Sequence, residues 1–126
     1  MKLKLTQPEI KNVIISIFAN GGLSYLNFTI DYDGVTYNKH KVSGACFEDN
    51  LYYLLKNGGE IIFIDNDDDD SEYTTRLTMK LINERFKTIT DESFIEDVIT
   101  TVKGEDDAET GYNLIQWLLF NELIFG

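Results

Sequence analysis

Two strand-like segments of the sequence flank a loop made almost entirely of carboxylates. Residues 60–64 form an apolar run of strand length, and residues 73–81 alternate apolar and polar side chains with period two. Between them, residues 65–72 read Asp-Asn-Asp-Asp-Asp-Asp-Ser-Glu. Neighbouring carboxylates repel one another and keep their hydration water, so this loop must lie at the surface. We therefore expect a hairpin whose tip presents a concentrated negative field.

Capping and turn residues predict the helices and strands of the first third of the chain. A capping box at residues 6–9 predicts a helix that ends at the Asn-Gly-Gly of residues 20–22. Residues 23–32 alternate as a strand. The Asp-Gly pair at residues 33–34 is typical of a tight hairpin turn, which would return the chain as a strand over residues 35–39. The sequence thus predicts two hairpins, this one and the acidic one.

Apolar residues at helical spacing predict the remaining elements. The expected helices cover about residues 47–55, a short segment at 81–86, residues 90–102, and residues 107–121 after a linker at 103–107. The resulting order is α-β-β-α-β-β-α-α-α. It predicts an α+β fold with about four antiparallel strands covered by helices.

The length and composition predict one cytoplasmic domain. A chain of 126 residues buries about two thirds of its unfolded surface, so we expect residues 1–126 to fold as a single domain. The single cysteine, Cys46, forms no internal disulfide, which favours a reducing compartment. The sequence has no apolar run of signal-peptide or membrane-span character. We therefore expect a soluble protein that does not associate with membranes.

No motif in the sequence predicts catalysis, a cofactor or a metal site. An EF-hand loop starting at Asp65 would need glycine at its sixth position and glutamate at its twelfth, but Asp70 and Arg76 stand there. A nucleophilic site would have to use His40, the only histidine, with Cys46 or a serine, and their spacing does not indicate that they meet. We therefore expect no catalytic residue, and the acidic loop offers at most weak binding of divalent cations.

The charge points to a basic partner. Residues 1–42 carry a balance of +2 and the other 84 residues a balance of −13, which gives the net −11. Direct binding of nucleic acid requires clustered lysine and arginine, so it is not expected. A ridge of carboxylates can instead imitate the phosphate track of DNA, and the alternative interpretation is a surface that serves solubility. The predicted partner-binding residues are Asp65, Asp67, Asp68, Asp69, Asp70, Glu72, Glu96, Asp97, Glu105, Asp106, Asp107 and Glu109.

The last helix offers an apolar alternative. At 100° per residue its inward stripe is formed by Leu114, Ile115, Leu118 and Leu119, while Glu109, Asn113 and Gln116 lie on the opposite side. Trp117 and Phe120 border the polar side, where they either complete the core or anchor a partner. A second hypothesis is therefore a self-associating module, such as a homodimer, whose apolar interface consists of Trp117, Phe120, Ile124 and Phe125.

The chain resembles the small acidic accessory proteins of bacteriophages and other mobile elements, among them anti-CRISPR proteins that act as DNA mimics. The features that carry the resemblance are the size, the single α+β domain, the acidic residues 65–72 and the lack of catalytic motifs. The resemblance implies a non-enzymatic inhibitor in the cytoplasm of a bacterial host cell. Such a protein would bind a basic nucleic-acid-handling protein, such as a CRISPR effector, and block access of nucleic acid or guide.

Overall fold

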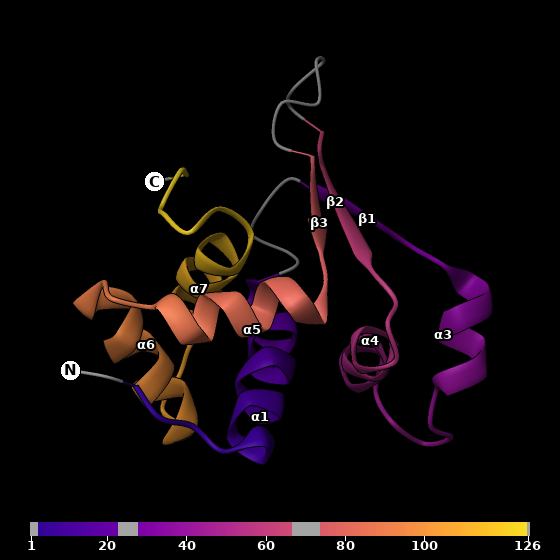
Figure 1. The fold of residues 1–126 in the computed structure, drawn as a ribbon, viewed down its shortest axis with the longest axis horizontal. Helices are drawn as coiled ribbons and strands as arrows, with labels where there is room; N and C mark the ends of the chain where they lie inside the picture. The colour runs from indigo at the N-terminus through magenta and orange to yellow at the C-terminus, as the bar shows by residue number, and fades with distance from the viewer. Residues whose placement is uncertain (1–2, 23–27, 67–73, 126) are drawn as a thin grey trace.

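The computed structural model describes residues 3–22, 28–66 and 74–125. Helices and a small antiparallel sheet give it an α+β architecture (Figure 1). Its elements are α1 (Gln7–Ile17), the π-helical turn η1 (Phe18–Gly22), β1 (Phe28–Tyr32), α3 (Gly34–His40), α4 (Phe47–Lys56), β2 (Ile61–Asp65), β3 (Thr75–Leu77), α5 (Met79–Thr88), α6 (Glu92–Val102) and α7 (Ala108–Phe120).

The sheet has β2 at its centre, paired antiparallel with β1 on one side and β3 on the other. Ile61 lies opposite both Tyr32 and Leu77. Residues directly opposite in an antiparallel pair project to the same face, so Ile61, Phe63 and Leu77 fill one face, and all three are buried in the core. The pairing of β2 with β3 confirms the predicted antiparallel pairing of these two segments.

The hairpin predicted at residues 33–34 is wrong, because Asp33 caps a helix there. Its side chain accepts hydrogen bonds from the Val35 backbone N–H at 2.9 Å and the Thr36 hydroxyl at 2.7 Å, and α3 begins at Gly34. An aspartate before glycine satisfies a helix N-cap as readily as a tight turn. Residues 35–39 are therefore helical, β1 pairs with β2, and the sheet of the described residues has three strands instead of four.

The strand predicted over residues 73–81 is shorter than its alternating pattern suggests. The Thr78 hydroxyl accepts a hydrogen bond from the Leu81 backbone N–H at 3.1 Å, which makes Thr78 the N-cap of α5. Strand β3 therefore ends at Leu77, and α5 is longer than the helix expected at residues 81–86. The other predicted helices form close to their expected bounds as α1, α4, α6 and α7, and α1 has the predicted capping box of Thr6 and Glu9.

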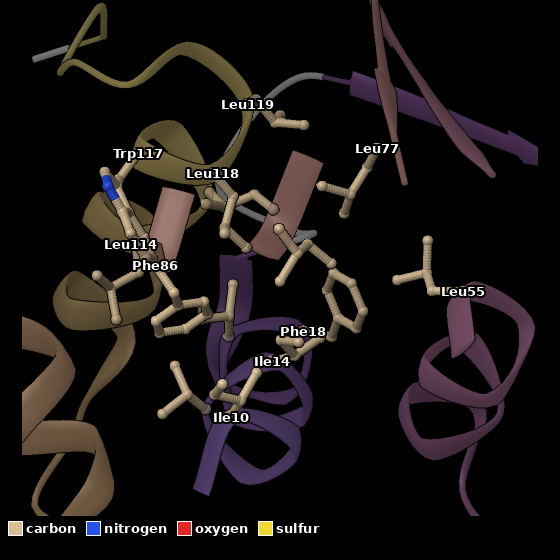
Figure 2. Close-up of a cluster of buried hydrophobic side chains, with 14 of the residues drawn as sticks. Ile10, Ile14, Phe18, Leu55, Leu77, Phe86, Leu114, Trp117, Leu118 and Leu119 are labelled. Carbon is tan, nitrogen blue, oxygen red and sulfur yellow. The ribbon is translucent and has the colours of Figure 1, made fainter. Parts of the chain in front are cut away.

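Helix α7 is the centre of the hydrophobic core and packs against η1, α6, α1, α5 and β3. Figure 2 shows Leu118 of α7 within the same cluster as Ile14 and Phe18, the latter at the start of η1. A Cβ atom added to Gly111 would lie 3.2 Å from the Asn20 carbonyl oxygen, so the glycine permits the close approach of α7 to η1. The core thus fixes the position of α7 relative to its neighbours, including α6.

Candidate partner-binding surface

Helices α6 and α7 place three other predicted carboxylates, those of Glu96, Asp107 and Glu109, within electrostatic reach of Asp97. The Asn113 side-chain amide donates a hydrogen bond to the Asp97 carboxylate at 3.4 Å, which links the two helices. Burial raises the pKa of Asp97 above its ordinary value, and repulsion from Glu96, Glu109 and Asp107 raises it further. Glu96, Asp97, Asp107 and Glu109 therefore interact electrostatically across the two helices, and we call these four residues the α6–α7 acidic cluster.

The acids of the linker before α7 serve the structure as well. Asp107 is the N-cap of α7, where its carboxylate accepts hydrogen bonds from the Thr110 backbone N–H and hydroxyl, each at 3.0 Å. These bonds lower the pKa of Asp107. Asp106 accepts a hydrogen bond from the Asn20 side-chain amide, which ties the linker to η1. Glu105 is exposed at the surface.

Asp65 was predicted to lie on the surface ridge of carboxylates, but it is buried. It is the last residue of β2, lies opposite Phe28 and is only 6% exposed. The inward alternation of Ile61 and Phe63 continues to Asp65, so the strand extends one residue further than predicted and places this carboxylate on the core side. The other acids of the predicted loop, Asp67, Asp68, Asp69, Asp70 and Glu72, lie outside the described residues.

The proposed apolar interface is wrong for Trp117. Its side chain is fully buried and lies beside Phe86 (Figure 2). The Trp117 ring centroid is 5.0 Å from that of Phe86 and 6.3 Å from that of Phe94. Phe120 and Phe125 are half-buried and pack on each other, with their ring centroids 6.3 Å apart. Trp117 thus completes the core, in accord with the first of the two interpretations of its position.

Gln116 has a role that the sequence did not indicate. Helical periodicity placed it on the polar side, yet it is fully buried. Its side-chain oxygen accepts hydrogen bonds from the backbone N–H groups of Ile124 at 2.9 Å and Phe125 at 2.7 Å. The chain after α7 is therefore held back against the helix. A glutamine within the apolar run of residues 114–120 was the one available signal for such an internal contact.

The tail held by Gln116 forms a hollow of about 580 Å³ with the first turns of α7. Its lining residues are Ala108, Glu109, Tyr112, Asn113, Leu123, Ile124 and Phe125. Glu109 belongs to the α6–α7 acidic cluster, Asn113 contacts Asp97, and Leu123 is 54% exposed. The predicted acidic residues and the predicted apolar interface, which are alternative binding surfaces, therefore both contribute to one hollow. Such a site suits the apolar stem and cationic head of a lysine or arginine side chain.

The two residues considered for nucleophilic chemistry lie at either end of the segment that connects α3 to α4. His40 is the last residue of α3, and Cys46 is the exposed N-cap of α4. Over residues 3–22, 28–66 and 74–125, no group of three or more His, Cys, Asp or Glu side chains is arranged to hold a metal ion. In the same ranges, no helix combines the length and the apolar character needed to cross a bilayer.

Three comparisons were made with known proteins. No protein-family model, no curated protein and no solved structure matches this chain. The α6–α7 acidic cluster and the adjoining hollow are therefore interpreted from their own geometry and charge.

Proposed function

We propose that the protein is a non-enzymatic inhibitor, encoded by a phage or another mobile element, that binds a basic nucleic-acid-handling protein such as a CRISPR effector. The α6–α7 acidic cluster would occupy a groove lined by lysine and arginine on that partner. Access of nucleic acid or guide would then be blocked. The observation that carries the proposal is the hydrogen bond from Asn113 to Asp97, which joins α7 to α6 and leaves the partly buried Asp97 within electrostatic reach of Glu96, Asp107 and Glu109.

The electrostatics of the cluster favour a cationic ligand. Burial and, to a smaller extent, repulsion among its carboxylates raise the pKa of Asp97, and a partner's ammonium or guanidinium group would offset that repulsion. The surrounding negative field would also speed association with a basic surface and make the association sensitive to salt. The hollow next to Glu109 adds apolar contact for the stem of the same side chain.

Self-association is the second function that we consider, because Leu123 at the rim of the hollow is an exposed large hydrophobic residue. With Trp117 in the core, the apolar surface at the end of α7 consists of Leu123 and the partly exposed Phe120, Ile124 and Phe125. A homodimer formed there would not depend on the charge of the acidic cluster, which separates the two functions experimentally.

The test is capture of partners from a bacterial lysate by the immobilised chain, followed by competition with duplex DNA. The test variant is Glu96→Gln, Asp97→Asn and Glu109→Gln combined. The control combines Asp31→Asn, Glu48→Gln and Glu84→Gln, which removes the same charge from positions outside the acidic cluster; Asp31 and Glu84 are exposed and Glu48 is half-buried. A further variant changes Asp67, Asp68, Asp69 and Asp70 to Asn, so that the contribution of the acidic loop is measured separately.

We expect the wild type and the control to retain a nucleic-acid-binding protein that high salt or duplex DNA releases, and the test variant to lose it. Equal retention by the test variant and the control would contradict the proposal. Sedimentation of the purified chain decides the alternative: a concentration-dependent dimer that persists in the test variant and is lost on Leu123→Ser would support self-association.

A further inference from the structure

Two adjacent hollows lie along α1 on a part of the surface separate from the acidic cluster. One, of about 530 Å³, is bounded by the N-terminal segment, α1 and α5. The other, of about 390 Å³, is bounded by α1, α4 and α5. Gln7 and Asn83 line both, so the hollows adjoin each other. In Figure 1, α5 crosses α1, with α4 on one side of α1 and the N-terminal segment on the other.

Each hollow carries a pair of lysines. Lys4 and Lys87 line the first, and Lys11 and Lys56 line the second, and we call the two hollows together the lysine groove. The chain has 22 acidic and 11 basic residues, yet no carboxylate of the described residues lines either hollow. None of the four lysines forms an ion pair with a described residue. The groove is therefore a local positive region in a strongly acidic protein.

Lys11 is held in place by aromatic rings. Its ammonium nitrogen lies 5.0 Å from the centroid of the Tyr53 ring and 5.8 Å from that of Tyr52. It also donates a hydrogen bond to the Tyr53 hydroxyl at 3.2 Å. These contacts orient the ammonium group without cancelling its charge. The groove thus contains one cation whose position is fixed before any ligand arrives, which lowers the entropy cost of binding an anion.

The backbone and the apolar lining add to this arrangement. Gln7 is the first residue of α1 and Met79 the first residue of α5, and both line the second hollow. The positive end of the α5 dipole therefore lies at the hollow that Lys11 and Lys56 line, whereas the Glu9 carboxylate already accepts a hydrogen bond from the Thr6 backbone N–H at the start of α1. The first hollow also has an apolar lining, formed by Leu3, Leu5, Ile10 and Phe86.

We propose that the lysine groove binds a small phosphate-bearing molecule with an apolar portion. Two ammonium groups in each hollow match the two negative charges of one phosphate group, and the side-chain amides of Gln7 and Asn83 supply hydrogen-bond donors between the pairs. The apolar portion would lie against the lining of the first hollow. A long polyanion is a poorer match, because the net charge of −11 repels it over its whole length, whereas a compact anion meets the local positive field.

The test is titration of the ¹⁵N-labelled chain with inorganic phosphate, inorganic pyrophosphate, hexyl phosphate and a short DNA duplex, followed by NMR at constant ionic strength. We expect saturable shifts at the backbone amides of Gln7, Lys11 and Asn83, with tighter binding of hexyl phosphate than of inorganic phosphate. The double variant Lys11→Gln, Lys56→Gln should weaken binding about tenfold or more. The matched control is Lys39→Gln, Lys41→Gln, which removes two exposed lysines from outside the groove and should bind as the wild type does.

Three results would overturn the proposal. Shifts that do not saturate would mean an adventitious ion only. Equal weakening in both double variants would mean a general effect of net charge. Tighter binding of duplex DNA than of pyrophosphate, per phosphate group, would assign the groove to nucleic acid instead of a small molecule. Thermal unfolding of each variant confirms that a loss of binding is not a loss of folding.

Discussion

Helices α7 and α3 both begin after an aspartate N-cap, Asp107 in one and Asp33 in the other, yet different forces hold them. Eight residues of α7 are buried, whereas none of the seven residues of α3 is. Figure 1 shows α7 among α1, α5 and α6, with α3 at the opposite end of the molecule. Packing therefore stabilises α7, while α3 depends on its cap and on contacts between the half-buried rings of Tyr32 and Tyr37 and that of Phe47.

The largest expected effect on stability is in α7, the helix that is held by packing. Trp117→Ala removes the indole from its contacts with Phe86 and Phe94 and leaves a cavity, so we expect a loss of about 3–5 kcal/mol in the free energy of unfolding. Tyr37→Ala in α3 removes contacts of a partly exposed ring and should cost about 1 kcal/mol. Urea denaturation followed by circular dichroism measures both.

Trp117→Phe is the matched control for the indole. It keeps an aromatic ring beside Phe86 and removes the indole N–H, which has no hydrogen-bond partner among the described residues. We therefore expect it to cost much less than Trp117→Ala, because an unpartnered buried donor contributes nothing favourable. Equal losses from Trp117→Ala and Tyr37→Ala would show that α7 is not the better packed helix.

The same contrast explains which parts of the fold could be predicted. The apolar stripe of α7 reports its burial directly, so periodicity located the helix and its inward residues Leu114 and Leu118. Residues 34–40 have no such stripe, and the local chemistry of Asp33 fits a turn and a cap equally, so only the pairing of β1 with β2 decides between them.

The candidate site was predictable in its residues but not in its arrangement. The sequence named Glu96, Asp97 and Glu109, because acids on the outer side of a helix follow from its periodicity. Their convergence depends on the packing of α6 against α7, which periodicity does not determine. The burial of Gln116 escaped prediction for a related reason, since its backbone partners Ile124 and Phe125 follow the end of the helix.

The second expected effect on the free energy of unfolding is smaller, and it is an increase instead of a decrease. The pKa of Asp97 is raised in the folded protein, so the ionised form of Asp97 disfavours folding. The free energy of unfolding therefore increases as the pH falls from above the folded pKa toward 3.8, because Asp97 becomes protonated. Asp97→Asn should therefore stabilise the protein at neutral pH, by at most about 1 kcal/mol because the site is partly exposed, and should remove this dependence on pH. Urea denaturation at several pH values measures it, and a destabilised variant at neutral pH would contradict the repulsion described for the acidic cluster.

The smallest effect on the stability of the whole protein is expected in α3, where the substitution and a fall in pH both destabilise the helix. Hydrogen bonds from the Thr36 hydroxyl and the Val35 N–H lower the pKa of Asp33, so its contribution to helix stability is complete above 3.8 and is lost as the pH falls through the folded pKa. Asp33→Ala should unwind α3 at every pH, as measured by the ¹³Cα chemical shifts of residues 34–40, and leave the shifts of α7 unchanged. Asp33→Asn keeps an N-cap oxygen that does not titrate, so α3 should persist in this variant at a pH where it frays in the wild type. If α3 instead stays intact in Asp33→Ala, its packing against α4 would be sufficient to hold it, and the two helices would differ less than their burial indicates.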